Sequence, residues 1–169
     1  MDFHRTGPRF CFASSWPAAL YYANFVSHRA PLASKAIVQM DVPKSLIARL
    51  APYTLSVNTD AGFSEWADLI YHCRRGDYLS RSLSHLSSKD LMIGPIATFP
   101  DNIYGKMRSS AEIKNNNVLR VGGVEASQPI FSADESVSKA LEKECRSHTF
   151  VHYELPEECP TINDAKDQI

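Results

Sequence analysis

Residues 124–141, which read VEASQPIFSADESVSKAL, decide the fold class of this chain. The first half is rich in β-forming residues and predicts a strand that turns sharply at Ser132. Ser132 and Glu135 have the spacing of a capping box, which predicts that a helix begins there. Gln128, an uncharged polar residue before a proline, either lines a pocket or caps the edge of a sheet. The predicted helix carries an apolar stripe at helical spacing, made by Val137, Ala140, Leu141 and Cys145.

The composition of the 169 residues is that of one globular domain, with 44% hydrophobic and 22% charged residues. The net charge of −1 gives no overall field that would attract nucleic acid or an anionic membrane. The sequence contains no apolar run of the length of a membrane span and no basic-then-apolar leader. We therefore expect a cytoplasmic monomer with no nucleic-acid or membrane partner. We expect one domain over residues 1–155 and a disordered acidic tail over residues 156–169.

The four cysteines lie far apart and form no C-x-x-C pair. They predict free thiols, and the scattered histidines predict no zinc site. The sequence also lacks G-x-G-x-x-G, G-x-x-x-x-G-K-[ST], H-E-x-x-H and G-x-S-x-G. These absences argue against a P-loop nucleotide hydrolase, a zincin and a nucleophile-elbow hydrolase.

Strands and helices are expected to mix without strict alternation, which favours an α+β fold with largely antiparallel pairing. Ser15 and Ser64 are the expected N-caps of two helices, residues 58–63 a loop, and Gly76 the residue after the second helix. The first helix should bury one face formed by Trp16, Ala19, Leu20, Ala23 and Val26. Strands are expected at residues 9–13, 35–42, 53–57, 90–98, 118–121 and 148–155, short helices after Pro43 and within 100–113, and a helical turn at 83–86.

Four motifs occur in an order that resembles a family of the ADP-ribosyltransferase-like superfamily. They are FCFASS before an Ala-rich helix, SEWADLIYHCRR, KDLMIGPIA, and SQPIFS before a helix, and the resemblance spans residues 2–155. It implies split, largely antiparallel sheets that clasp NAD, which serves as the substrate. The implied activity is mono-ADP-ribosyl transfer to a macromolecular acceptor that the sequence does not identify.

The resemblance also assigns residues to the NAD site. Ser14 or Ser15 matches a hydroxyl position that supports the nicotinamide site. Gln128 matches the late position that bonds the nicotinamide ribose, where the superfamily carries an acidic residue and this family tends to carry glutamine. Tyr21 and Tyr22 would stack on nicotinamide, and His4 belongs to a stretch, FHRT, that resembles the Tyr-His-Gly-Thr motif of the first strand. The usual spacer after that motif is missing, so either the first strand is absent or residues 2–4 end the intervening loop.

Gln128 limits the implied chemistry. Cleavage of the nicotinamide–ribose bond passes through an oxocarbenium-like cation, which a carboxylate would stabilise. Glutamine can orient the ribose but carries no charge, and losing such an electrostatic partner costs about 10²–10³-fold in rate. Two alternatives therefore stand beside the transferase: a catalytically inactive relative that binds a protein partner, and a small-molecule hydrolase of another α+β class.

Overall fold

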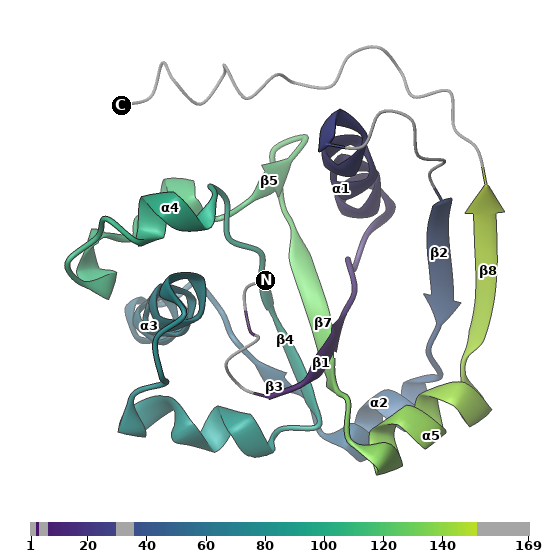
Figure 1. The fold of residues 1–169 in the computed structure, drawn as a ribbon. Coiled ribbons are helices and arrows are strands. Elements are labelled where there is room, and N and C mark those ends of the chain that lie inside the picture. Colours follow the sequence, from purple (N-terminus) through teal and green to yellow (C-terminus); the bar gives the residue numbers. More distant parts are fainter. Residues whose placement is uncertain (1–2, 4–6, 30–35, 152–169) are drawn as a thin grey trace.

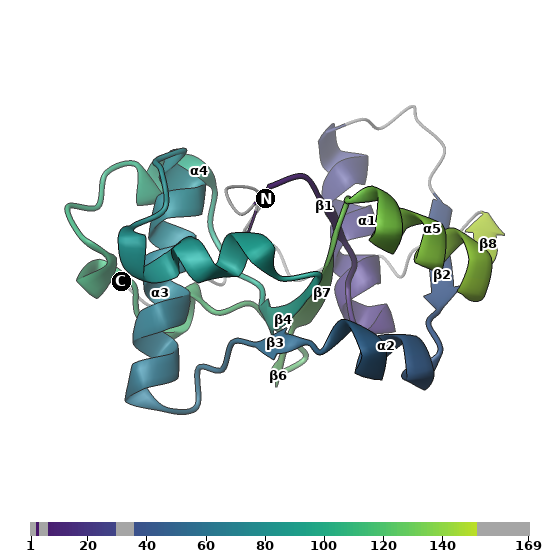
Figure 2. The ribbon, with the colours of Figure 1, turned by 90° about the horizontal axis from the view of Figure 1, so that it is seen from below.

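The structure, a computed structural model, describes Phe3 and residues 7–29 and 36–151. The expected tail, residues 152–155 of the last expected strand, and His4 lie outside the described residues. A central sheet divides the molecule: α3 and α4 lie on one side of it, and α1, α2, α5 and the β2–β8 pair lie on the other (Figures 1 and 2).

The central sheet has the strand order β1-β7-β4-β3. Its neighbours are antiparallel except β3 and β4, which are parallel. A second sheet pairs β2 with β8, and a third pairs β5 with β6, both antiparallel. The expected α+β class with largely antiparallel pairing is confirmed. The strands are β1 Arg9–Cys11, β2 Ala36–Asp41, β3 Tyr53–Thr54, β4 Leu91–Pro95, β5 Arg120–Val121, β6 Val124–Glu125, β7 Ser127–Ser132 and β8 Arg146–Val151.

Helices connect these strands and cover both faces of the central sheet (Figure 2). The α-helices are α1 Trp16–Arg29, α2 Lys44–Leu50, α3 Asp60–Arg75, α4 Asp101–Tyr104 and α5 Glu135–Glu144. Short 3₁₀ segments follow at η2 Arg81–Ser88, η3 Ser110–Glu112 and η4 Asn115–Asn117. None of the helices in the described part of the chain is long and apolar enough to cross a membrane.

Side-chain alternation along β7 produces a core on each face of the sheet. Ile130 packs in a cluster with Trp66 and Leu69 of α3. Phe131 points to the other face and packs with Leu46 of α2 and with α5. The predicted apolar stripe of α5 is confirmed, because Val137 and Leu141 are buried there and Ala140 and Cys145 pack against them.

The predicted capping box at Ser132 is wrong. The helix begins three residues later, at Glu135, after Asp134. The Ser132 hydroxyl donates to Asp134 Oδ2 at 2.6 Å and accepts from the Asp134 N–H at 3.2 Å. Ser132 therefore stabilises the turn before the helix rather than the helix itself.

The prediction that Ser64 caps a helix after a loop at residues 58–63 is also wrong. Helix α3 begins at Asp60, and the side chain of Thr59 accepts from the Gly62 N–H. The end of this helix was predicted correctly. Gly76 has a φ of 75°, and the N–H groups of Gly76 and Asp77 donate to the carbonyls of Cys73 and His72, which is a Schellman ending.

Several expected elements are shorter than the sequence indicates. Strand β1 ends at Cys11. The next residue, Phe12, still donates its N–H to the Pro129 carbonyl, but Pro129 has no N–H to donate in return. Strand β3 is only Tyr53–Thr54, β5 is only Arg120–Val121, and helix within 100–113 is limited to α4 and η3. Among residues 16–25 of the first helix, Ala18 is fully buried, and Trp16, expected on the buried face, is 42% exposed. The side chain of Val26, also expected on that face, lies outside the described part.

Candidate functional site

Ser14 and Ser127 form a hydroxyl pair where β1 exits the sheet and β7 enters it. The Ser14 N–H donates to the Ser127 carbonyl at 3.0 Å, which fixes the two backbones together. Ser14 Oγ lies 2.8 Å from the Ser127 carbonyl oxygen and 2.7 Å from Ser127 Oγ. Since a hydroxyl carries one hydrogen, Ser14 donates to the carbonyl and accepts from Ser127. One lone pair of the exposed Ser14 Oγ then remains for a donor from a ligand.

Gln128 follows Ser127 directly and is 7% exposed. It lies opposite Gly94 of β4, in a strand that has β1 on its other side. The interpretation that Gln128 caps a sheet edge is therefore wrong, because β7 is an interior strand. A proline in such a strand goes against the usual preference for edges. Pro129 removes only the one bond that its N–H would have donated to Phe12, and the bonds from Phe12 N–H to Pro129 and from Ser14 N–H to Ser127 remain.

Two buried apolar side chains lie on the face of the sheet next to Gln128. A Cβ built at Gly94 would lie 3.1 Å from Leu55 Cβ and 3.5 Å from Phe3 Cζ. Residues directly opposite in an antiparallel pair point to the same face, so Gln128 shares its face with these two side chains. Phe3 is fully buried and Leu55 is 3% exposed. Because Ser127 and Gln128 are consecutive in β7, their side chains point to opposite faces of the sheet, and Gln128 lies on the face of Ile130 and α3.

Helix α1 starts immediately beyond Ser14. The Ser15 side chain accepts from the Ala18 N–H at 3.4 Å, and the Ser15 carbonyl accepts from Ala19 N–H, as expected for an N-cap. The first turn contains no acidic residue, so the positive end of the helix dipole is not neutralised there. This end of the helix therefore favours a negatively charged group beside Ser14.

Tyr21 and Tyr22 occupy the next turn of α1. Their rings meet edge to face at a centroid distance of 5.9 Å. Tyr21 packs against the buried cluster that includes Ala18 and Ala126, and Ala126 immediately precedes Ser127. Tyr22 is 39% exposed. Of the two, Tyr21 is anchored next to the start of β7.

The structure therefore brings Ser14 and Ser127 together beside the start of α1, whereas Gln128 is next to Ser127 in the chain but points to the opposite face of the sheet. The sequence assigned no role to Ser127, although its adjacency to Gln128 was an available signal. Gly94 and Phe3 belong to the motifs KDLMIGPIA and FHRT, but the contact between them is recognised only in the folded chain. Within residues 3, 7–29 and 36–151, no cluster of three or more His, Cys, Asp or Glu side chains could hold a metal.

A second polar cluster joins β3, α3 and η2 away from this site. The Tyr53 hydroxyl donates to Glu65 Oε1 at 2.7 Å, and His85 Nε2 lies 3.5 Å from the same oxygen. The hydrogen bond to Glu65, with a smaller contribution from burial, raises the pKa of Tyr53 above its ordinary value. The His85 Nδ1 lies 2.9 Å from the Ser82 carbonyl, so this nitrogen carries a proton. The cluster ties an edge strand to two helical segments.

Comparisons with protein-family models, with curated proteins and with solved structures each gave no match.

Proposed function

We propose that this chain is an ADP-ribosyltransferase-like protein that binds NAD at the Ser14–Ser127 pair and transfers ADP-ribose to a macromolecular acceptor. The observation that carries the proposal is the hydrogen bonding of Ser14 to Ser127, one residue from Gln128. It places Ser14, which the family resemblance assigns to the nicotinamide, beside the residue that precedes Gln128, which the resemblance assigns to the ribose. The split, mostly antiparallel sheets are compatible with that fold.

The local chemistry supports a ligand with a carboxamide and a diphosphate. The remaining lone pair of Ser14 Oγ can accept a carboxamide N–H of nicotinamide. The positive end of α1 can stabilise a phosphate, because no acidic residue occupies its first turn. Tyr21 provides an aromatic ring one to two helical turns from Ser14.

Gln128 sets the expected rate. Its amide can bond the ribose hydroxyls, but it supplies neither a negative charge for the oxocarbenium-like transition state nor a base. Transfer should therefore be about 10²–10³-fold slower than with a carboxylate at this position. An acceptor that is already a strong nucleophile would depend least on the missing base.

A catalytically inactive relative that binds a protein partner is the second candidate. The observation in its favour is the packing of Phe3 and Leu55 against Gly94, on the face that Gln128 shares. If these side chains keep the space beside Gln128 closed, NAD cannot reach the amide. The exposed aromatic residues Trp16 and Phe25 of α1, each 42% exposed, would then belong to a protein-binding surface.

Thermal unfolding of the full chain with NAD tests the first candidate. At 100 times its Kd, NAD should add about 2.7 kcal/mol of stability. For a chain of this size, this raises Tm by about 5 to 10 °C. Ser14→Ala should weaken binding about tenfold through loss of a hydrogen bond. Ser82→Ala is the matched control, because Ser82 forms a similar hydroxyl pair with Ser80 on η2, at 2.8 Å, and should leave NAD binding unchanged.

The variant Gln128→Glu separates the two candidates. With labelled NAD and a protein lysate, a site open to NAD should transfer ADP-ribose about 10²–10³-fold faster in this variant. If the space is closed, the new carboxylate is buried among apolar groups, so the variant loses stability and no label is transferred. Absence of both transfer and an NAD-dependent rise in Tm, in the wild type and in the variant, rejects the transferase.

A further inference from the structure

A cavity of about 590 Å³ opens at the start of α3, on the side of the central sheet away from α1. Three segments line it: the loop between β3 and α3, the first two turns of α3, and the chain from η3 to η4. The lining residues are Val57, Asn58, Thr59, Asp60, Phe63, Ser64, Ala67, Ser110, Ala111, Ile113, Lys114 and Asn115. The volume lies in the range of small-molecule sites.

The lining divides into an apolar floor and a polar rim. Ala67 and Ile113 are buried, and the ring of Phe63 is partly buried against Trp66 at a centroid distance of 5.7 Å. The side chains of four rim residues form no hydrogen bond or ion pair with any described residue, so they are available to a ligand: Asn58, Asp60, Ser64 and Asn115.

A close backbone contact fixes the loop side of the cavity. A Cβ at Gly62 would lie 2.4 Å from the Ser56 carbonyl oxygen, so only glycine allows the loop to approach the first turn of α3. Thr59 adds to this contact, since its hydroxyl accepts from Gly62 N–H and its carbonyl accepts from Phe63 N–H. The loop that carries Asn58 is therefore held against α3.

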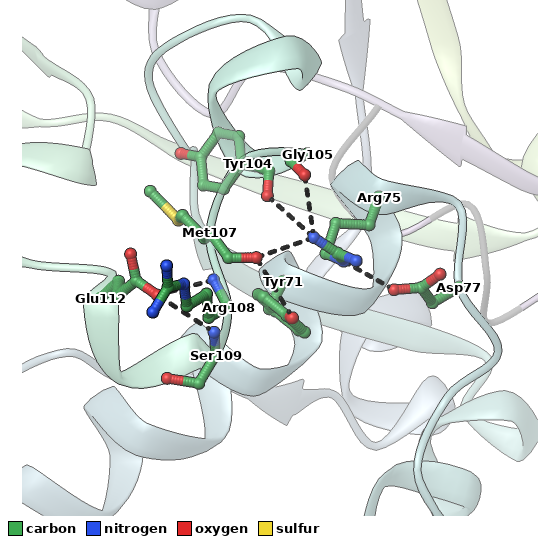
Figure 3. A network of polar contacts seen from close by, with 9 residues as sticks. All are labelled: Tyr71, Arg75, Asp77, Tyr104, Gly105, Met107, Arg108, Ser109 and Glu112. Carbon is green, nitrogen blue, oxygen red and sulfur yellow. Dashed lines mark hydrogen bonds and ion pairs between the residues drawn. The ribbon is translucent and has the colours of Figure 1, made fainter.

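Hydrogen bonds to α3 fix the opposite wall. The Ser110 hydroxyl donates to Asp68, the residue after Ala67 of the floor. Arg75, at the far end of α3, donates to the carbonyls of Tyr104, Gly105 and Met107, and its guanidinium lies 4.8 Å from the ring centre of Tyr71 (Figure 3).

Glu112 completes this wall. Its Oε1 accepts from the Arg108 and Ser109 N–H groups at 2.6 and 3.3 Å, and it thereby closes the turn into η3 (Figure 3). Both walls are thus fixed without a ligand, which lowers the entropic cost of binding one.

The charges on the rim specify the ligand. Asp60 contributes one negative charge and Lys114 one positive charge, so the rim has no net charge. The Lys114 ammonium donates to the Ala111 carbonyl at 2.8 Å, and Asp60 forms no ion pair with any described residue. A phosphate would meet the Asp60 carboxylate as well as the Lys114 ammonium, so the rim gives an anion no net electrostatic attraction. A hydroxyl group fits, because it can donate to a carboxylate and accept from an amide such as that of Asn58 or Asn115.

We infer that this cavity binds a neutral, hydroxylated ring compound, either a nucleoside or a monosaccharide. A flat or apolar ring face lies on Phe63, and the ligand hydroxyls bond to Asp60, Asn58 and Asn115. The site is separate from the Ser14–Ser127 pair, and it does not depend on the function proposed there.

Backbone NMR spectra of the full chain, titrated with adenosine and separately with glucose, test this inference. At least one of them should give saturable shifts confined to residues 57–67 and 110–115, and the two arms decide between nucleoside and sugar. Asp60→Asn and Asn115→Ala should each weaken the binding about tenfold. Glu135→Gln is the matched control, because it removes the same charge from the first residue of α5 and should leave the affinity unchanged.

Two results would overturn the inference. One is the absence of saturable shifts in these residues with both compounds at up to about 10 mM. The other is adenosine binding that perturbs only Ser14, Ser127 and Gln128, which would assign the nucleoside to the other site. AMP should bind no more tightly than adenosine, and binding about tenfold tighter would contradict a neutral ligand. Failure of NAD to bind would leave all of these outcomes unchanged.

Discussion

At the scale of single residues, Gln128 combines a polar side chain with almost complete burial. Buried amides are stable when they are hydrogen-bonded, whereas a buried carboxylate also has to overcome the loss of its hydration. Phe3 and Leu55 make the neighbouring space apolar, which favours a neutral side chain at this position. The same burial limits what Gln128 could contribute to catalysis, since only an amide with an open path to NAD could hold its ribose.

Tyr53 provides a prediction about pH. Its folded-state pKa is raised, chiefly by the hydrogen bond to Glu65, so this bond contributes stability in full below the ordinary tyrosine pKa of about 10. The contribution is lost as the pH rises through the folded-state pKa. We expect Tyr53→Phe to be less stable than the wild type by about 1 kcal/mol at pH 8, and this difference should close above pH 10.

Urea unfolding between pH 8 and pH 11.5 measures the difference. The Lys89 ammonium lies 5.4 Å from the Tyr53 ring centre, so the comparison should be repeated in a Lys89→Gln background. A stability difference that stays constant across the range would show that the hydrogen bond to Glu65 is not its source.

The sequence predicted part of the candidate site at this scale. Ser14 and Gln128 were singled out by the motif order, and the structure bonds Ser14 to Ser127, the residue before Gln128 in β7. The roles of Gly94 and Phe3 were not predictable, because each depends on a contact between segments that are far apart in the chain. No local pattern indicates which side chains will lie opposite a given strand position.

At the scale of elements, helix interiors were predicted better than helix starts. The apolar stripe of α3 follows from its spacing, and Trp66, Leu69, Ile70 and Cys73 are buried as expected. The start of that helix was placed too late because Thr59 and Ser64 are both acceptable caps. In the folded chain, the close contact of Gly62 with Ser56 favours Thr59 as the cap, and this tertiary contact cannot be read from the sequence.

Gly62→Ala tests that contact. In an exposed helix this change would normally stabilise by about 0.8–1 kcal/mol. Here the added Cβ would meet the Ser56 carbonyl oxygen at 2.4 Å, so we expect a loss of about 1–3 kcal/mol in the free energy of unfolding. Gly105→Ala is the matched control, because its nearest contact is 3.5 Å and its φ is −59°. Equal effects of the two variants in denaturant unfolding would refute the close approach of the loop.

At the scale of the whole molecule, the fold class was predictable and the strand order was not. The mixture of strand-like and helix-like segments indicated an α+β fold, which the three small sheets confirm. The position of β7 between β1 and β4 could not be predicted, since β1 and β7 are separated by more than a hundred residues. Pro129 even argued for an edge, but in this interior strand it removes only one backbone bond, the one its N–H would have donated to Phe12.

The arrangement gives the molecule two separate candidate binding regions. The Ser14–Ser127 pair lies just before α1, and the cavity lies at the start of α3. Helices α1 and α3 lie on opposite sides of the central sheet (Figure 1). Their chemistry differs as well, because α1 offers a positive helix end for an anion, whereas the cavity rim carries an unpaired carboxylate. NAD should therefore bind at the first region and not at the second.

The most direct measurement is a crystal structure of the full chain soaked with NAD. We predict electron density for NAD beside α1, with the nicotinamide carboxamide within about 3.2 Å of Ser14 Oγ and its ribose next to Gln128. An empty site with Phe3 and Leu55 still packed against Gly94, or NAD bound only in the cavity at the start of α3, would contradict the proposal.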